Sequence, residues 1–207
     1  PSAALPQAMR EQLCASAVAL AKAVQYRGAG TLEYLYDDAS GAFYFIEMNT
    51  RIQVEHPVTE MITGIDLVRE MLRIAGGQPL RYKQADVRLN GHAIEVRICA
   101  EDPAQGFKPG PGTISTLKVP GGPGVRFDTL LYQGYTVPPF YDSLLGKLIV
   151  WDETRAQAIA RMARALGELE VGGLPTTKPL HQALARDAEV QAGKFHTRWL
   201  EPWLDQN

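Results

Sequence analysis

The sequence predicts an α+β fold, in which runs of helices and runs of antiparallel strands are segregated along the chain. Apolar residues recur at helical spacing in residues 6–27 and 66–76, whereas residues 92–151 contain short strand-like runs separated by Gly and Pro. Hydrophobic residues make up 45% of the chain and charged residues 21%, as in ordinary globular proteins. We therefore expect a folded protein with an antiparallel sheet and flanking helices.

The first part of the chain contains two predicted helices. An amphipathic helix should begin after Pro6 and end before Gly28, because apolar residues recur at helical spacing at Met9, Leu13, Ala17, Leu20 and Val24. Asp66 is expected to cap a second helix, which should stop at Gly76 and Gly77.

A β-hairpin is predicted between these helices. Residues 31–36 and 43–48 are rich in aromatic and branched side chains, and the turn-forming residues 37–41 lie between them. If the hairpin folds symmetrically about Ser40, Glu33 lies opposite Glu47 on the neighbouring strand.

The second part should form the antiparallel sheet, with strands at residues 92–100, 113–119, 124–128 and 144–151. Thr154 can cap a helix that follows, and a shorter helix should start near Pro179. The tail from Trp199 to Trp203 is expected to dock on the core. We place the boundary between the two domains in the loop after Gly77, which gives domains of residues 1–78 and 79–207.

Composition excludes several classes of protein. The chain has 21 basic and 23 acidic residues without a basic run, so no nucleic-acid or membrane-surface partner is expected. Cys14 and Cys99 form neither a disulfide framework nor a zinc motif, which fits a reducing compartment. Without a predicted signal peptide or membrane span, we expect a cytoplasmic protein whose partners are small molecules or other proteins.

The carboxylates of the hairpin are candidate metal ligands. Alternate residues of a strand share a face, so Glu47 and Asn49 point the same way, and Arg51 and Gln53 follow if the chain stays extended, while Ile46 and Met48 point to the other face. Two opposed carboxylates repel each other by roughly 3 kcal/mol at an effective dielectric near 20, and a cation would remove this cost. With an Asn carbonyl they form a hard oxygen set that suits Mg²⁺ or Mn²⁺. A solvated sheet face with Lys or Arg neighbours is an equally good interpretation.

The next segment, residues 51–57, alternates polar and apolar residues. Arg51 could hold a planar oxyanion such as bicarbonate, and the carboxylate of Glu55 could remove a proton from it. On spacing alone, a surface ion pair is the more common outcome. His56 precedes Pro57 and is expected to be extended, with no chemical role.

Residues 47–60, EMNTRIQVEHPVTE, closely resemble the signature of biotin carboxylases, which belong to the ATP-grasp superfamily. The resemblance continues through residues 26–31, 100–103, 120–126 and 141–148 and so spans nearly the whole chain. It implies the C-terminal half of an ATP-grasp fold in residues 1–78, followed by a biotin carboxylase C-terminal domain in residues 79–207.

The resemblance also implies site residues. The implied metal ligands are Glu33, Glu47 and Asn49, of which Glu33 and Glu47 are also implied ATP contacts. The implied bicarbonate-binding residues are Arg51, Gln53 and Val54, with Glu55 as the general base, and the implied adenine contacts are Leu35 and Ile46. Arg126 is implied to contact the biotin ureido group, although by sequence alone an arginine after a Gly-rich loop is better explained as an anchor for that loop.

The implied reaction is ATP-dependent carboxylation of biotin. Its cofactors are MgATP or MnATP, with two metal ions, and biotin linked to a carrier is the substrate. The implied partners are a biotin carboxyl carrier protein or domain, a carboxyltransferase and a second copy of the chain in a homodimer.

One departure from the family is large. The N-terminal lobe and the glycine-rich lid of biotin carboxylases have no counterpart in this sequence, and the chain does not begin with Met. We therefore expect a piece of a longer enzyme that folds but does not turn over ATP by itself. The alternatives are another ATP-grasp ligase of the carbamoyl phosphate synthetase type and a noncatalytic assembly module.

Overall fold

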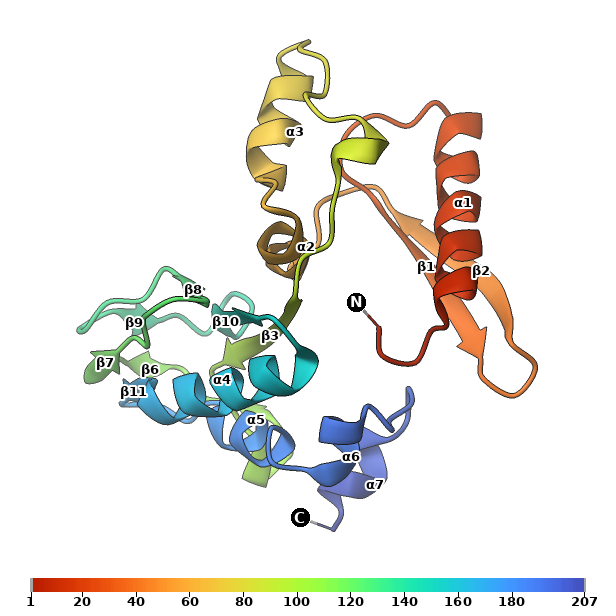
Figure 1. Cartoon of the computed structure of the whole chain (residues 1–207). Coiled ribbons are helices and arrows are strands. Elements are labelled where there is room, and N and C mark those ends of the chain that lie inside the picture. Colours follow the sequence, from red (N-terminus) through yellow and green to blue (C-terminus); the bar gives the residue numbers. More distant parts are fainter. Residues whose placement is uncertain (1, 207) are drawn as a thin grey trace. The chain divides into compact units, whose positions relative to one another are not determined.

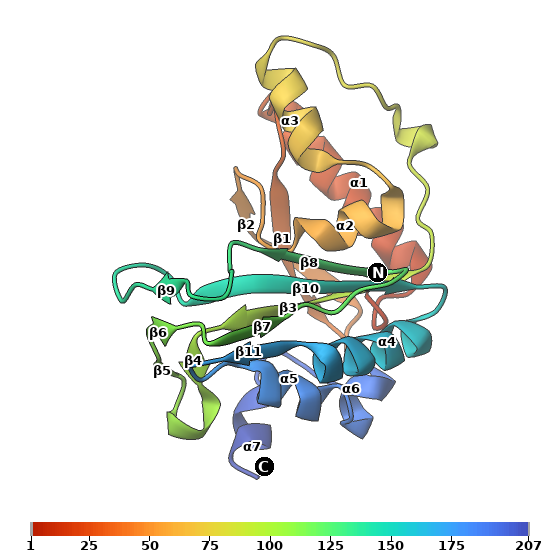
Figure 2. The ribbon, with the colours of Figure 1, turned by 90° about the vertical axis from the view of Figure 1, so that its left-hand side faces the viewer.

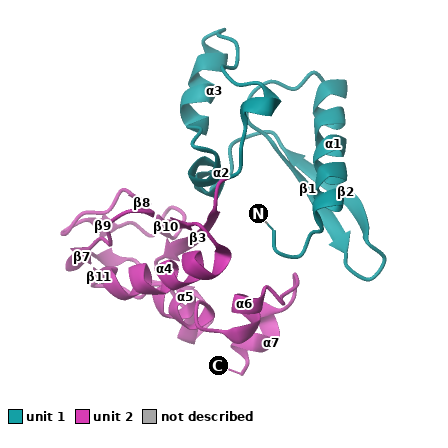
Figure 3. Cartoon of the chain, in the orientation of Figure 1, with its two compact units in different colours: residues 1–89 teal, residues 90–207 magenta. Residues whose placement is uncertain are grey.

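The computed structural model describes residues 2–206 (Figure 1). The chain divides into two compact units, Pro1–Leu89 and Asn90–Asn207 (Figure 3). Both helices and antiparallel strands are present, which confirms the predicted α+β class. Within the described residues, we find no helix with the length and apolar character needed to cross a membrane.

The first unit consists of helices around a two-stranded hairpin. Its elements are α1 (Gln7–Ala23), β1 (Thr31–Asp37), β2 (Ala42–Asn49), α2 (His56–Thr63), α3 (Leu67–Ala75) and the 3₁₀ helix η1 (Gln84–Asp86).

Both predicted helices of this unit are confirmed. Helix α1 follows Pro6, and its apolar residues Met9, Leu13 and Leu20 are partly buried. Helix α3 begins after Asp66, whose Oδ1 accepts a hydrogen bond from the backbone N–H of Arg69 at 2.8 Å. This bond satisfies one of the free N–H groups in the first turn, so Asp66 acts as the predicted cap.

The hairpin turn is organised by Asp37. Its carboxylate accepts hydrogen bonds from the Ser40 hydroxyl at 2.5 Å and from the Ala39 N–H at 3.0 Å. These bonds hold the pKa of Asp37 below its usual value. Gly41 closes the turn with φ of 69°, a conformation that glycine adopts without steric cost.

Helix α2 corrects one prediction. His56 was expected to be extended because it precedes a proline, but it is the first residue of α2, and Pro57 is the second. Proline fits the first turn of a helix because its missing N–H would have no partner there. The His56 ring is also fixed locally, since Nδ1 lies 2.7 Å from the carbonyl oxygen of Gln53.

The second unit is built on a three-stranded antiparallel sheet in the order β3-β10-β8 (Figure 2). Its strands are β3 (His92–Cys99), β4 (Glu101–Asp102), β5 (Lys108–Pro109), β6 (Gly112–Thr113), β7 (Thr116–Lys118), β8 (Val125–Thr129), β9 (Thr136–Val137), β10 (Leu144–Asp152) and β11 (Glu170–Gly172). Its helices are η2 (Pro103–Gln105), α4 (Arg155–Glu168), α5 (Lys178–Leu184), α6 (Ala188–Ala192) and α7 (Leu200–Leu204). The predicted antiparallel sheet is therefore confirmed.

One predicted strand is divided. Residues 113–119 were expected to form a single strand, but β6 pairs with β9 whereas β7 pairs with β11. The division falls at Ile114 and Ser115, whose N–H groups donate to the carbonyls of Tyr135 and Gly172 respectively. The chain passes from one strand partner to another at this point.

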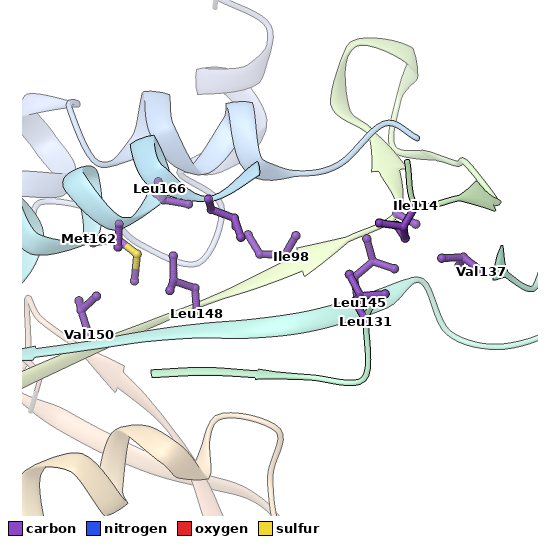
Figure 4. Packing of buried hydrophobic residues seen from close by; sticks show 12 residues of the cluster. Ile98, Ile114, Leu131, Val137, Leu145, Leu148, Val150, Met162 and Leu166 are labelled. Carbon is purple, nitrogen blue, oxygen red and sulfur yellow. The ribbon is translucent and has the colours of Figure 1, made fainter. Parts of the chain in front are cut away.

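The core of the second unit lies between the sheet and α4 (Figures 2 and 4). Ile98 of β3 and Leu148 and Val150 of β10 pack with Met162 and Leu166 of α4. Thr154 caps α4 as predicted, because its hydroxyl oxygen accepts from the N–H of Gln157 while the Gln157 side chain accepts from the N–H of Thr154. Since side chains alternate along strands, the opposite face of the sheet carries Arg97, Lys147 and Asp128 together with the buried Ile149.

The C-terminal tail docks differently from the prediction. Trp199 and Trp203 were expected to anchor in the core, yet neither belongs to the buried cluster of this unit. Their indole N–H groups donate instead to carboxylates at the start of α6, from Trp199 to Glu189 at 2.6 Å and from Trp203 to Asp187 at 2.9 Å. An indole N–H needs a polar partner when it is partly buried, and these carboxylates provide one.

Candidate functional site

The hairpin brings the two predicted carboxylates together. Glu33 of β1 is the direct partner of Glu47 of β2 in the antiparallel register. A β-bulge follows this pair, because Tyr34 pairs with Phe45 and Ile46 is left without a partner in the ladder. The predicted opposition of the carboxylates is confirmed, and the strict alternation that was expected along β2 is interrupted at Ile46.

Asn49 links the two carboxylates. Its Nδ2 donates to Glu33 Oε1 at 2.7 Å and to Glu47 Oε1 at 3.2 Å. The amide oxygen of Asn49 accepts from Arg51 Nη2 at 3.3 Å. One amide therefore offsets part of the repulsion between the carboxylates and connects them to an arginine.

Arg51 continues this chain of contacts. Its Nη1 donates to Gln53 Oε1 at 3.0 Å and to the carbonyl oxygen of Ile52 at 3.2 Å. Strand β2 ends at Asn49 and the backbone bends at Arg51, so the extended form does not continue to Gln53. Hydrogen bonds between side chains, rather than strand alternation, bring Asn49, Arg51 and Gln53 together.

Glu55 and Val54 lie in the turn between this cluster and α2. Glu55 occupies the N-cap position of the helix, and its side chain is exposed. Its carbonyl oxygen accepts from the N–H of Val58 at 3.1 Å, as in a first helical turn. Helix α2 therefore fixes the backbone at Glu55, four residues after Arg51 in the chain.

The chemistry of the cluster suits a divalent cation. Glu33, Glu47 and Asn49 supply hard oxygen atoms, which Mg²⁺ and Mn²⁺ prefer. Coordination by Asn49 requires its amide to turn, since Nδ2 faces the carboxylates and Oδ1 faces Arg51. Within residues 2–206, no group of three or more His, Cys, Asp and Glu side chains is placed to hold a metal ion. The amide of Asn49 therefore has to complete the donor set.

The two predicted adenine contacts are exposed apolar residues of the same hairpin. Leu35 is 50% exposed and Ile46 is 57% exposed. Leu35 lies two residues after Glu33 on β1 and therefore on the same face of the hairpin. Apolar surface thus adjoins the carboxylates without being covered by the described residues of this unit.

Arg126 belongs to the second unit, on the face of the sheet that α4 does not cover. Its Nε and Nη2 donate to the two carboxylate oxygens of Asp128 at 2.8 and 2.7 Å. Lys147 of β10 lies 3.9 Å from the same carboxylate. The Gly-rich loop before β8 is held by other groups, since Arg161 donates to the carbonyl of Pro123 and the N–H of Trp151 donates to Gly124.

A second arginine of this face was not considered in the sequence reasoning. Arg97 of β3 pairs with Lys147 of β10, which in turn pairs with Asp128 of β8, so the three side chains form one row across the sheet. The Arg97 side chain is exposed. The alternation of Glu95 and Arg97 along a predicted strand was the signal that could have identified it.

Together, the fold and the side chains define an α+β protein with opposed carboxylates, an amide and an arginine on a hairpin. Comparison with known families makes this more specific. Residues 95–202 match the biotin carboxylase C-terminal domain, and residues 1–83 match the ATP binding domain of the carbamoyl-phosphate synthase L chain. The chain belongs to the biotin carboxylase C-terminal domain family, as the sequence motifs predicted.

Proteins named biotin carboxylase are similar to this chain along nearly its whole length. The biotin carboxylase of Nostoc sp. is 54% identical over 201 residues, which cover 97% of this chain and 45% of the relative. Biotin carboxylase 1 of Bacillus subtilis is 51% identical over 203 residues, covering 98% of this chain and 45% of the relative. The chain therefore spans less than half the length of these relatives.

The structural comparison agrees. The biotin carboxylase domain of a thermophilic 2-oxoglutarate carboxylase bound to bicarbonate matches with a TM-score of 0.95 and 50% identity, covering 99% of this chain and 46% of that chain. A similar match is the biotin carboxylase domain dimer of the Hydrogenobacter thermophilus enzyme in complex with MgADP, ADP and bicarbonate, with 50% identity, a TM-score of 0.95 and coverage of 99% and 45%.

Proposed function

We propose that this chain supplies the metal-binding and bicarbonate-binding part of a biotin carboxylase, which uses MgATP and bicarbonate to carboxylate biotin on a carrier. The observation that carries the proposal is the continuous set of contacts from the Glu33–Glu47 pair through Asn49 to Arg51 and Gln53. It places hard oxygen ligands next to a guanidinium, which is the combination that a metal-bound nucleotide and an oxyanion require.

In this proposal Glu33, Glu47 and Asn49 hold one or two Mg²⁺ or Mn²⁺ ions together with ATP. Such ions neutralise charge on the phosphate oxygens and orient the group that is transferred. The exposed apolar side chains of Leu35 and Ile46 supply contacts to the adenine ring. Burial of these side chains by the nucleotide would contribute to binding.

Bicarbonate is assigned to the segment after β2. Arg51 and Gln53 hold the oxyanion through N–H donors, and the segment at Val54 supplies backbone contacts. Glu55 removes the proton of bicarbonate, whose oxygen then attacks the γ-phosphate of ATP to give carboxyphosphate and ADP. Carboxyphosphate breaks into CO₂ and phosphate, the phosphate takes a proton from the ureido nitrogen of biotin, and that nitrogen attacks CO₂.

The negative oxygen of the biotin ureido group needs a fixed donor, and an arginine of the β3-β10-β8 sheet is proposed for this role. Arg126 is the residue that the resemblance implies. The bidentate pair with Asp128 holds its guanidinium in a fixed position on the sheet.

The wider organisation is proposed on the same basis. Residues 1–78 would form the C-terminal portion of an ATP-grasp domain, and residues 79–207 the biotin carboxylase C-terminal domain. The partners would be a biotin carboxyl carrier protein or domain, a carboxyltransferase and a second copy in a homodimer. A carboxylase context is supported by the crystal structure of the biotin carboxylase component of a pyruvate carboxylase, which is 46% identical with a TM-score of 0.94 and covers 99% of this chain and 46% of its own.

The test uses a full-length biotin carboxylase that carries this chain as its C-terminal part, called the full-length enzyme below. We expect bicarbonate-dependent formation of ADP and carboxylation of free biotin, and a loss of both by about a hundredfold or more in Glu55→Gln, because a general base is removed. Glu11→Gln, an exposed carboxylate of α1, is the matched control and should change neither rate.

Undiminished activity of Glu55→Gln would contradict the role of this residue. We expect the 207-residue chain alone to show no ATP cleavage, because it spans about 45% of the relatives. Sizing of the same sample addresses the assembly-module alternative. A full-length enzyme that assembles but neither cleaves ATP nor carboxylates biotin would support that alternative and contradict the proposal.

A further inference from the structure

The turn between β2 and α2 is held by a histidine. The carbonyl oxygen of Gln53 accepts from the backbone N–H of His56 at 3.3 Å, and Nδ1 of the His56 ring lies 2.7 Å from the same oxygen. Because a carbonyl oxygen only accepts, Nδ1 must carry a hydrogen and donate it. His56 therefore supplies two donors to one carbonyl, and its side chain is only 15% exposed.

A carboxylate lies on the other side of the ring. Glu60 follows His56 by one turn of α2, and its Oε2 is 4.0 Å from Nε2 of the ring. Its Oε1 accepts at 2.8 Å from the N–H of Leu67, the first residue of α3. A helix leaves this N–H without an intrahelical partner, and its dipole favours a carboxylate there. Helix α3 therefore fixes Glu60, which in turn limits how the His56 ring can rotate.

Gln53 is held at both its side chain and its backbone. Arg51 Nη1 donates to Gln53 Oε1 at 3.0 Å, while His56 holds the Gln53 carbonyl. Since Oε1 faces the arginine, the Nε2 end of the planar amide points away from it and is the donor group of this side chain. The contacts thus run from the start of α3 through Glu60 and His56 to the residue that carries this amide.

We propose that His56, oriented by Glu60, is a positioning residue that fixes the backbone of Gln53 and thereby aims the Gln53 amide at bicarbonate. This inference rests on the proposed function, in which Gln53 binds bicarbonate. An amide on a loose turn must be ordered each time the anion binds, whereas an amide on a fixed backbone is already in place. The competing explanation is that His56 only stabilises the first turn of α2 by a local bond to the backbone.

The experiment measures bicarbonate-dependent ATP cleavage by the full-length enzyme. His56→Phe keeps a ring and removes both nitrogens. We expect it to raise the KM for bicarbonate about tenfold, because a small misplacement of a binding group is costly, and to change the KM for MgATP by less than about twofold. Glu60→Ala should raise the KM for bicarbonate by a smaller factor, because the ring keeps its bond to Gln53. Thr63→Val removes a side-chain bond to the Thr59 carbonyl elsewhere on α2 and should change neither KM.

Two amide substitutions separate positioning from helix stability. The amide nitrogen of Asn lies as many bonds from the backbone as Nδ1 of histidine, and that of Gln as many as Nε2. His56→Asn should therefore restore most of the bicarbonate affinity that His56→Phe loses, whereas His56→Gln should not. Thermal unfolding of the same variants is the comparison. If the KM for bicarbonate follows the unfolding temperature rather than the position of the donor, the positioning role is wrong.

The double variant Gln53→Ala/His56→Phe shows whether His56 acts through Gln53. If it does, His56→Phe raises the KM for bicarbonate in the parent but adds no rise when Gln53 is already replaced. Rises that multiply, or equal rises in the KM for bicarbonate and for MgATP in His56→Phe, would overturn the positioning role and leave the assignment of Gln53 intact. An unchanged KM for bicarbonate in Gln53→Ala would contradict the assignment of Gln53 to bicarbonate, and the positioning role with it.

Discussion

Glu33 and Glu47 face each other directly across the β1-β2 hairpin, and the side-chain amide of Asn49 donates to both carboxylates. A hairpin stabilised only by packing would gain nothing from two opposed negative charges. A bound cation, as proposed above, would remove this repulsion. The amide reduces the cost of holding the two carboxylates together until that ligand binds.

Replacement of Glu47 by Gln should separate stability from function. In the 207-residue chain we expect Glu47→Gln to raise the free energy of unfolding by about 0.5 kcal/mol, because a like-charge pair across two strands is removed. In the full-length enzyme the same change should raise the Mg²⁺ concentration needed for half-maximal ATP cleavage, since one anionic ligand is lost.

Denaturant unfolding and a Mg²⁺ titration measure the two effects. Asp38→Asn is the control, because it removes one negative charge from the tip of the same hairpin and leaves the carboxylate pair intact. A Mg²⁺ dependence that is the same in Glu47→Gln as in the parent would exclude Glu47 as a ligand.

Two arginines should act at different steps of the reaction. Arg51→Met should lower both ATP cleavage and biotin carboxylation, because its guanidinium would hold the oxyanions of the first step. An arginine that contacts only biotin should instead lose carboxylation by about a hundredfold and retain biotin-independent ATP cleavage. We expect this second pattern for Arg126→Met.

The stability of Arg126→Met is measured as well. Because Arg126 forms a bidentate pair with Asp128, we expect this variant to lower the free energy of unfolding by about 1 kcal/mol. Equal losses of ATP cleavage and of biotin carboxylation in Arg126→Met would show that Arg126 is a structural anchor or a phosphate contact, and would contradict its assignment to biotin.

Asp187 predicts a dependence of stability on pH. The N–H of Val190 and the indole N–H of Trp203 hold the pKa of Asp187 below its ordinary value of 3.8. The stabilisation is therefore fully present above pH 3.8 and is lost as the pH falls below it, because the unfolded chain takes up the proton first.

The stability difference between the parent chain and Asp187→Asn should accordingly be constant from pH 7 to about pH 5 and shrink towards pH 3. Urea unfolding at each pH measures it, with the exposed Asp205→Asn as control. A difference that stays constant down to pH 3 would show that the bonds to Val190 and Trp203 do not depend on the charge of Asp187.

Lys178 supplies a cap at the C-terminal end of α4. Its Nζ donates to the carbonyl oxygen of Leu169, the C-cap residue of that helix, at 2.5 Å. Lys178→Met should lower the free energy of unfolding by about 1 kcal/mol, because the carbonyl loses a charged donor at the negative end of the helix dipole. Lys118→Met removes an ion pair with Glu170 in which the Lys118 side chain is 70% exposed. This change should alter the free energy of unfolding by less than about 0.5 kcal/mol. Thermal unfolding of the two variants compares these values.

The sequence by itself determined several helices, their caps and the pair of carboxylates in the hairpin. Helical periodicity identified α1, α3 and α4, and Asp66 and Thr154 were recognisable as caps because a cap is a local hydrogen bond. An assumed symmetry of the hairpin about Ser40 predicted the Glu33–Glu47 pair. The turn itself pairs Asp37 with Ala42, and the bulge at Ile46 is what brings Glu47 opposite Glu33. Helix α2 was missed because Pro57 was taken as the sign of an extended chain, although a proline also fits a first helical turn.

Only the tertiary structure decided how residues distant in sequence meet. The row of Arg97, Lys147 and Asp128 depends on the pairing of three strands, and the contact of Thr177 and His181 with Arg97 joins residues about 80 positions apart. No periodicity within a single segment encodes such pairings, because they follow from the packing of α4 and α5 against the sheet. The partner of Arg126 was near in sequence but became evident only once β8 placed Asp128 on the same face.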